Sequence, residues 1–395
     1  MIPSKTALVA VESNISRDPR VRRQVDWLVD DGWVVDTIGL GPSSTQTVRD
    51  HFELGSAPKW TRGPLGSLLA YGLLRRGWTF AALTRTRIPP TVRDRVRSGG
   101  YDLIILNDRH FTPWVADRRD FGDANRSTHV HLDLHEYFPQ DLRGKSLWAR
   151  LAGPSYRWAR KTFAHPRFDS RSTVNTGISR LYAGEFGIPE PAVIRNSPPF
   201  VEQSPSPVVD SAIRLLHHGI ASWDRGLRQM VDAVRMCEPR FSLTLMLLGD
   251  QGLINELKDY AADLGDRVRV VPPAPMEELS RVVNDFDIEI MFYRPTTRNL
   301  ELALPNKFFE AVQGRLGLIV GESPMMAEIV REYQNGVVVS GWDAADLARA
   351  LDAVTVNDVV RFKAASERAA QDLNADVERS VFLSVVAGER AKGQS

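Results

Sequence analysis

Cysteine is almost absent from this chain of 395 residues. Cys237 is the only one, so the sequence allows no internal disulfide and no metal site made from a cluster of cysteines. No stretch approaches the roughly 18 consecutive apolar residues of a membrane span, and the apolar run at 6–11 meets Glu12 too early for a signal peptide. These absences predict a cytoplasmic protein.

The usual dinucleotide and metal motifs are also missing or poorly placed. No Gly-x-Gly-x-x-Gly follows the first predicted strand, which disfavours a nicotinamide or flavin site. Asp285 and Asp287 flank Phe286 at the start of a predicted strand, so we interpret them as a helix end and a strand start rather than as metal ligands. His129 and His131 alternate within another predicted strand, and we expect them to pack rather than to catalyse.

Acidic residues are scarce in the first half of the chain. Residues 1–198 contain 29 Lys and Arg against 20 Asp and Glu, a net charge of +9. The remainder contains 21 against 29, a net charge of −8, so the overall net charge is only +1. This division indicates that the N-terminal half meets something anionic.

Two stretches of that half, 54–93 and 142–168, each contain seven basic residues and no acidic one. Both carry tryptophans, namely Trp60, Trp78, Trp148 and Trp158. Basic side chains mixed with Trp and Leu suit an anionic membrane surface, and 63–78 has the pattern of an amphipathic insertion. An ordinary packed helical region with a cationic rim fits as well, and the pattern leaves both hypotheses open. No nucleic-acid-binding module accompanies the charge, so no nucleic acid is expected.

Short β-branched runs alternate with helical patterns along the chain, which is typical of βαβ units with parallel sheets. The predicted strands are 6–11, 33–40, 101–107, 128–135, 172–179, 213–219, 241–249, 267–272, 287–293 and 316–321. Segment 196–211 is rich in Pro and Ser and reads as a linker, and 343–391 has further helical patterns. The predicted fold class is therefore α/β, with two doubly wound Rossmann-like domains whose parallel sheets face an interdomain cleft.

A helix is predicted from Pro305 to Gln313 within "LPNKFFEAVQGRLGLIVGESP", residues 304–324. Proline is favourable at a first helical position, and Gly314 can stop the helix. Lys307 lies in the first turn, where the helix dipole is positive and an acidic residue would be the better choice.

The cation is explained if that helix start binds an anion. Asn306, Lys307 and Glu310 share one face of the helix, where exposed N–H groups suit an anion and Glu310 could accept hydrogen bonds from hydroxyls. A solvated face with a Lys307–Glu310 ion pair is an equally good interpretation of this helix alone.

A second strand-to-helix junction at 217–234 has the same feature. After Gly219 a helix is predicted to begin near Ser222 or Asp224, with Arg225 in or beside its first turn. Two such junctions in one half suggest a shared polyanion, such as a diphosphate, between Arg225 and Lys307. The alternative is that Asp224 simply neutralises Arg225.

At this point the sequence resembles the GT4-type retaining glycosyltransferases of GT-B fold. "LPNKFFEAVQGRLGLIV" is similar to the family's "PxKxxEYxAxGxPVI" segment, and "HHGIASWDRGLRQMVDA" to its "GxxxxxxKGxxxLxxA" diphosphate loop. "HLDLHEYFP" resembles its "DxHE" segment, while "SRDPRVRRQVDWLVDDGWVVDTIGL" and "GISRLYAGEFGIPEPAVIRNSPPF" resemble the start and the close of its first domain. The segments occur in the expected order over nearly the whole chain.

The resemblance implies roles for individual residues. Arg225 and Lys307, with the backbone around Asn306, would contact the donor diphosphate, and Glu310 would accept the ribose hydroxyls. His135 would lie near the donor sugar and the reacting oxygens. Gly219 would allow the backbone to approach the ligand, because it has no Cβ.

Two positions depart from the family's pattern. Ile220 stands where an arginine often follows the glycine, and Leu302 stands where the first of two paired glutamates is expected, with Glu301 one position away. These departures leave the donor sugar open and also leave room for an inactive homologue.

Two weaker candidates lie on the acceptor side. Asp18 is a predicted N-cap with Pro19 at the first helical position, so Arg20 would join the helix start near the end of the first strand and could face the cleft. Asn107 and Asp108 end another strand, where a functional role and a turn-forming role are equally good interpretations.

The resemblance, together with the residues above, predicts a glycosyltransferase that moves a sugar from a UDP-, GDP- or dTDP-linked donor to a hydroxyl acceptor. It further implies retention of configuration and no need for a metal or other cofactor. The acceptor would be a sugar, a lipid-linked glycan or a small molecule. The predicted domains are 1–198 for the acceptor and 212–375 for the nucleotide sugar, with a linker at 199–211 and a helix at 376–395 that crosses back. A nucleotide-sugar epimerase and a non-catalytic partner protein of the same fold are the alternatives.

Overall fold

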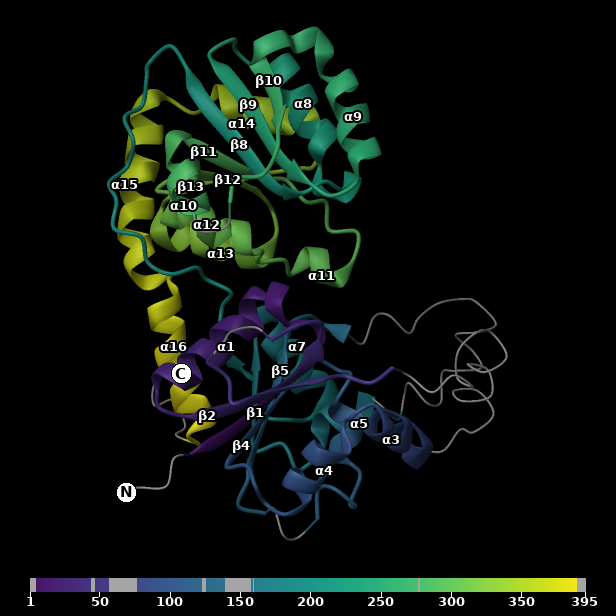
Figure 1. Ribbon diagram of the computed structural model, residues 1–395. Helices are drawn as coiled ribbons and strands as arrows, with labels where there is room; N and C mark the ends of the chain where they lie inside the picture. The colour runs from purple at the N-terminus through teal and green to yellow at the C-terminus, as the bar shows by residue number, and fades with distance from the viewer. Residues whose placement is uncertain are drawn as a thin grey trace. The chain divides into compact units, whose positions relative to one another are not determined.

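The computed structural model describes residues 5–43, 47–56, 77–122, 126–138, 158, 160–275 and 278–388 (Figure 1). The chain divides into two compact units. The first comprises Met1–Arg195 and Arg379–Ser395, and the second comprises Asn196–Glu378.

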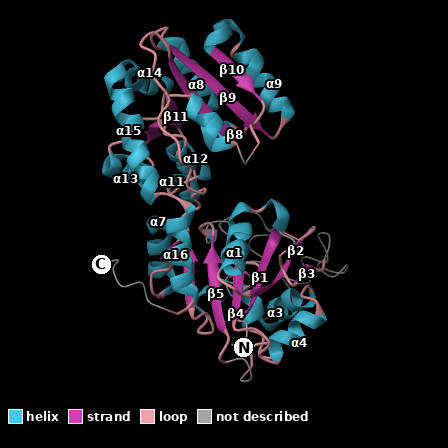
Figure 2. Ribbon diagram, turned by 60° about the vertical axis from the view of Figure 1, so that its left-hand side comes forward, coloured by secondary structure: helices cyan, strands magenta, loops and turns pink. Residues whose placement is uncertain are grey.

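The first unit contains a parallel sheet of seven strands in the order β3-β2-β1-β4-β5-β6-β7. The strands are β1 Thr6–Asn14, β2 Val34–Leu40, β3 Asp50–Glu53, β4 Leu103–Asn107, β5 His129–Leu134, β6 Ser170–Thr173 and β7 Ala192–Val193. Its α-helices are α1 Pro19–Asp30, α3 Gly77–Thr86, α4 Pro90–Arg97, α5 Thr112–Val115 and α7 Thr176–Phe186. Figure 2 shows helices (cyan) beside the strands (magenta) of this sheet.

The last helix, α16 Ala375–Val386, begins in the second unit and continues in the first. There it packs against α1, where the rings of Trp27 and Phe382 lie 5.4 Å apart. Phe382 is fully buried, so this contact anchors the C-terminal helix on the first unit.

The second unit contains a parallel sheet of six strands in the order β10-β9-β8-β11-β12-β13. The strands are β8 Ile213–Ile220, β9 Phe241–Leu248, β10 Val268–Val271, β11 Ile288–Met291, β12 Gly317–Gly321 and β13 Gly336–Val339. The helices are α8 Leu227–Met236, α9 Gln251–Tyr260, α10 Leu279–Val282, α11 Arg298–Glu301, α12 Asn306–Gln313, α13 Pro324–Tyr333, α14 Ala344–Asp352 and α15 Val356–Asp372.

Helices cover both faces of this second sheet, because successive strand residues point to opposite sides. Leu215 of β8 joins a buried cluster with α8 and α14, whereas its neighbour Leu216 joins a second cluster with α12 and α13. In the same way, Ile290 of β11 belongs to the first cluster and Met291 to the second. The two layers of helices confirm the predicted doubly wound α/β fold.

One predicted strand is partly wrong. Residues 172–179 were expected to be extended throughout, but β6 ends at Thr173 and α7 begins at Thr176. The side chain of Asn175 accepts a hydrogen bond from the backbone N–H of Ile178 (2.8 Å), so it acts as an N-cap and starts the helix. The sequence also gave no indication of β3, β7 and β13, which are too short to show a clear alternation.

The predicted helix at 305–313 is present as α12, with Pro305 as its N-cap rather than its first residue. Gly314 ends the helix as expected, but for a different reason. Its φ is −75°, and Arg315 takes the left-handed conformation instead. A Cβ at Gly314 would lie 2.3 Å from Cγ2 of Val283, so close packing requires the glycine.

Most of the predicted amphipathic insertion at 63–78 and much of 142–168 lie outside the described residues, as do Trp60 and Trp148. The membrane-surface hypothesis therefore stays a prediction. Within the ranges that the structure describes, no helix is both long enough and apolar enough to cross a bilayer.

Candidate functional site

The strand order places a switch point between β8 and β11 in the second unit. The chain leaves β8 towards β9 and β10 on one side, then returns to form β11 on the other. Ligands in doubly wound sheets bind outside the carboxyl ends of the strands at such a point. Gly219 near the end of β8, Tyr293 after β11 and the start of α12 all belong to this edge.

Lys307 is buried at this edge, with only 6% of its surface exposed. Its Nζ lies 3.2 Å from Nε2 of His217 and 5.7 Å from the centre of the Tyr293 ring. Burial lowers the pKa of Lys307 to about 7, with Arg225 acting in the same direction and Glu289 opposing. The predicted ion pair with Glu310 does not occur among the described residues, so a solvated face is the wrong interpretation of this helix.

Nε2 of His217 accepts a hydrogen bond from Lys307, because the other ring nitrogen, Nδ1, carries the proton. Nδ1 lies 2.7 Å from the carbonyl oxygen of Ile290, so it carries the proton and Nε2 presents a lone pair. Burial and the neighbouring Lys307 hold the pKa of His217 well below its ordinary value. The imidazole is therefore a neutral acceptor for the ammonium group.

Gly219 adopts a left-handed φ of +120°, which side-chain-bearing residues rarely take. An added Cβ would lie 2.9 Å from Nζ and 3.0 Å from Cε of Lys307. The space beside Gly219 is thus occupied by the lysine, whereas the sequence suggested that a ligand would use it.

Replacing Gly219 by alanine should therefore displace the Lys307 ammonium and strain the backbone. Energies of roughly 1–3 kcal/mol accompany such strained conformations, so we expect a loss of stability in that range. The measurement is the midpoint of urea unfolding for Gly219→Ala beside the wild type. Gly184→Ala is the control, because no atom lies within 4 Å of a Cβ at that helical glycine. Equal midpoints for Gly219→Ala and the wild type would contradict the prediction.

Glu310 is bound to a histidine rather than to a lysine. Its Oε2 lies 2.9 Å from Nε2 of His218, and Nδ1 of the same ring lies 3.0 Å from Oε2 of Glu289. Burial opposes a charge on this ring, but Glu289 and Glu310 outweigh it and raise the pKa of His218 to about 9. His218 is therefore an imidazolium at neutral pH, held between two carboxylates.

Arg225 approaches the same edge from a short 3-10 turn, Trp223–Arg225, that precedes α8. It is therefore not in the first turn of the α-helix, because Gly226 adopts a left-handed conformation and separates the two. The Arg225 guanidinium lies 5.0 Å from the centre of the Tyr293 ring. The Tyr293 hydroxyl is buried, and burial raises its pKa while the neighbouring Arg225 opposes this, so a neutral hydroxyl lies beside the guanidinium.

Asn306 and Glu301 hold other positions near α12. The Asn306 side chain accepts a hydrogen bond from Asn196 (2.6 Å). Glu301 pairs with Arg298 at 2.7 Å within the single turn of α11, while Leu302 is buried. The carboxylate of Glu301 is thus engaged locally.

The first unit gathers a second charged cluster at the ends of β4 and β5. Asp133 is fully buried and accepts two bonds of 2.7 Å from the guanidinium of Arg20. Gln24 and Ser172 also donate to it, at 2.5 and 2.7 Å. Burial disfavours the charged carboxylate, but Arg20 outweighs this and holds the pKa of Asp133 well below its ordinary value.

Asp18 and Pro19 begin α1 as predicted, because the Asp18 side chain accepts from the N–H of Arg20 at 3.2 Å. Arg20 also donates to the carbonyl oxygen of Ile194 (2.7 Å) and is only 5% exposed. Its guanidinium is therefore engaged within the first unit, which suits a role that acts through Asp133.

His135 follows β5 and lies between acidic partners. Its Nε2 is 3.2 Å from Asp133 and 3.1 Å from Oδ1 of Asn107, and its Nδ1 is 3.4 Å from Asp108. Burial opposes protonation, but Asp108 and Asp133 outweigh it and raise the pKa of His135. Asp108 has a positive φ of 62° and accepts the backbone N–H of His135, an unusual conformation that concentrates at functional sites.

Asp285 ends a 3-10 turn and Asp287 comes directly before β11, which agrees with the predicted helix end and strand start. His131 is buried between Ser170 and Ser172, and burial lowers its pKa to about 3. Asp287 precedes β11 and pairs with Arg214 and Lys363 at 3.0 and 3.3 Å.

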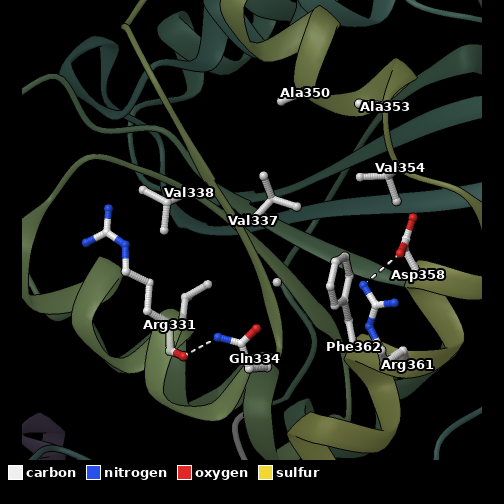
Figure 3. Close-up of a pocket in the computed structure, with 12 residues that line it drawn as sticks. Arg331, Gln334, Val337, Val338, Ala350, Ala353, Val354, Asp358, Arg361 and Phe362 are labelled. Atoms are coloured by element: carbon white, nitrogen blue, oxygen red, sulfur yellow. Dashed lines mark hydrogen bonds and ion pairs between the residues drawn. The ribbon is translucent and has the colours of Figure 1, made fainter.

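A separate pocket of about 520 Å³ opens beside β13 (Figure 3). Val337 and Val338 of the edge strand line it together with Phe362, and Arg361 pairs with Asp358 at its rim. It contains none of the predicted site residues.

Sequence reasoning assigned no role to His217, His218, Glu289, Asp133 or Tyr293. A signal was present for three of them, because ionisable residues at 217, 218 and 289 interrupt otherwise apolar strands. Ionisable side chains are buried only when they have polar partners, so these three residues indicate a buried polar network in the second unit.

Comparison with known proteins agrees with this arrangement. Residues 212–357 match the family model described as "Glycosyl transferases group 1". No curated protein matches the chain.

Solved structures resemble nearly the whole chain. A glycosyltransferase from Rickettsia africae has a TM-score of 0.68 at 12% identity, covering 99% of this chain and 100% of the other. Sucrose-phosphate synthase from Thermosynechococcus elongatus gives 0.67 at 15%, covering 96% and 97%. Anabaena HepE in complex with UDP gives 0.66 at 14%, covering 97% and 99%.

These likenesses define the fold as GT-B. The match to a group 1 glycosyltransferase domain lies within the second unit and indicates a glycosyltransferase.

Proposed function

We propose that this glycosyltransferase moves a sugar from a nucleoside-diphosphate donor to a hydroxyl acceptor with retention of the anomeric configuration. The second unit would hold the nucleotide and the first unit the acceptor. The observation that carries the proposal is the buried Lys307, which lies at the β8/β11 switch point beside Glu310 and within the field of Arg225.

The electrostatics of this edge suit a departing diphosphate. When the bond between the sugar and the diphosphate breaks, the electron pair stays with the phosphate oxygen. Lys307, Arg225 and the N–H groups at the start of α12 are in place before that charge develops, so little reorganisation is needed. A bound diphosphate would also restore the proton of Lys307, since an anion nearby raises the pKa of an amine.

His135 would serve the reacting end from the first unit. Its imidazolium, held by Asp108 and Asp133, would place positive charge near the reacting oxygens and stabilise negative charge that develops there. Retention follows the resemblance to GT4-type enzymes, and no metal is needed in this scheme.

The donor base and the acceptor are proposed by class. HepE has been solved with UDP, which supports UDP before GDP or dTDP. The acceptor would be a sugar, a lipid-linked glycan or a small molecule, in cell-surface glycan, glycolipid or natural-product assembly. Association of the basic first half with an anionic membrane at the cytoplasmic face remains a prediction, and an anionic acceptor would explain the same charge.

The test is to incubate the protein with UDP-, GDP- and dTDP-linked sugars and a panel of hydroxyl acceptors, and to measure nucleoside diphosphate release. Acceptor-dependent release from one donor is expected. A new sugar formed without acceptor would indicate an epimerase instead. Absence of both binding and turnover with every donor would favour the non-catalytic partner.

Arg225→Ala should weaken binding of the nucleoside diphosphate. A hydrogen bond to a charged group contributes roughly 1.5–3 kcal/mol, so calorimetry should show about a tenfold to hundredfold loss. Arg228→Ala is the matched control, because this arginine is exposed, pairs with Glu256 and lies 4.2 Å from the centre of the Trp223 ring. Equal affinities in the two variants would remove Arg225 from the site.

A further inference from the structure

Glu289 is a carboxylate in an unexpected place. It lies in the middle of β11, is fully buried and belongs to an edge that is proposed to bind a diphosphate. A buried carboxylate is costly unless it is paired, and an additional negative charge would repel the ligand. A second role at this edge would explain why it is there.

Glu289 is paired with His218 of the neighbouring strand β8. Its Oε1 accepts the backbone N–H of His218 at 3.2 Å, and its Oε2 lies 3.0 Å from Nδ1 of the same residue. β8 and β11 are paired in parallel, with Glu289 opposite Leu216, so the sheet itself fixes this geometry. Glu289 therefore holds the ring of His218 at two points.

The ring of His218 passes this constraint to α12. Its Nε2 lies 2.9 Å from Oε2 of Glu310, and the His218 side chain is only 4% exposed. Both ring nitrogens face carboxylate oxygens, so both must carry protons. Glu310 is 15% exposed, and one of its two oxygens is held by the ring.

The structure assigns Glu289 and His218 as positioning residues that hold the carboxylate of Glu310 oriented to accept the ribose hydroxyls of the donor nucleotide. The assignment rests on the proposed function. A carboxylate that is fixed by one oxygen presents the other in a defined direction, which is the purpose of such supporting contacts.

The two contacts of His218 with Glu289 and Glu310 depend on the positive charge of its ring. The raised pKa of about 9 supports an imidazolium at neutral pH and predicts its loss in alkaline solution. Deprotonation removes one of the two donors, so the ring can then hold only one glutamate. The other ionisable groups around this edge are His217 from β8, Arg225 from the 3-10 turn, Tyr293 after β11, and Lys307 from α12.

The experiment compares wild type and Glu289→Gln across pH 6–10 by calorimetry. The probes are UDP, GDP and dTDP, and inorganic diphosphate, which has no ribose. Affinity of the wild type for the nucleotide that binds should fall, relative to inorganic diphosphate, as pH rises through about 9. In Glu289→Gln this fall should move to lower pH by about one to three units, because the neutral amide no longer favours the imidazolium.

Inorganic diphosphate separates this effect from Lys307. Glu289 favours the charged form of Lys307, so diphosphate affinity should fall at lower pH in Glu289→Gln than in the wild type. The ratio of nucleotide to diphosphate affinity removes this contribution, because both probes meet Lys307. Glu256→Gln also removes one acidic charge from the second unit, but on an exposed surface pair with Arg228, and should leave both curves at their wild-type positions.

A second variant covers the case in which Glu289→Gln does not fold. His218→Gln has no charge to lose, so its nucleotide affinity relative to diphosphate should be weak and independent of pH near 9. A uniform drop in Glu289→Gln with an unmoved midpoint would overturn the positioning role while leaving the proposed function intact. Failure of all three nucleotides to bind the wild type would overturn both.

Discussion

Replacing Lys307 by methionine should stabilise the unliganded protein and at the same time abolish tight diphosphate binding. The ammonium group is buried beside a neutral imidazole, and its charge is disfavoured until an anion arrives. Methionine keeps most of the volume and removes the charge. The stability gain should be on the order of a few kcal/mol, and the loss of nucleoside-diphosphate affinity about a hundredfold.

The stability difference between Lys307→Met and the wild type should depend on pH. The folded-state pKa of Lys307, about 7, lies below the ordinary value of 10.5. Below pH 7 both folded and unfolded chains carry the charge, so the cost of burying it is fully present. Between 7 and 10.5 the unfolded chain binds more protons, and wild-type stability rises with pH. The advantage of Lys307→Met should therefore be largest below pH 7 and disappear towards pH 10.5.

Urea unfolding of unliganded protein at pH 6, 8 and 10 measures this difference, and calorimetry measures binding. Lys258→Met is the control, because Lys258 is exposed on α9 and should change neither quantity. A less stable Lys307→Met at pH 6 would mean that the ammonium group supports the unliganded fold rather than opposing it.

Arg20→Met should have the largest destabilising effect in the first unit. It leaves Asp133 fully buried without the guanidinium that donates to it and compensates its charge, and breaking a buried pair in this way costs about 3–5 kcal/mol. Unfolding by urea at neutral pH should show the loss. Arg22→Met on the same helix is the control, because Arg22 is exposed.

Two further measurements identify the cause as the orphaned carboxylate. Arg20→Met combined with Asp133→Asn should be more stable than Arg20→Met alone. The deficit of Arg20→Met should also shrink as pH falls, because the pKa of Asp133 is depressed in the wild type and its stabilising contribution is lost as pH falls through that value. A deficit that is constant with pH would indicate lost packing instead.

Local patterns were sufficient for most of the fold. Short β-branched runs predicted the long strands, and Asp18 with Pro19 predicted the start of α1, because both depend on neighbours in the sequence. The same local logic misplaced the end of β6, where the Asn175 cap overrides the β-branched run. The adverse charge of Lys307 in the first turn of α12 was visible for the same reason.

Partners that are distant in sequence could be decided only by the tertiary structure. Sequence identified Lys307 and Glu310 as neighbours on one helix and left an ion pair between them as one interpretation, but each contacts a different residue of β8 instead. Lys307 meets His217, and Glu310 meets His218, each about 90 residues away in the chain. Helical spacing determines which side chains share a face. Which charge is buried, and which protonation state it adopts, depends on the strand that the face packs against, because burial and charge at short range set the pKa together.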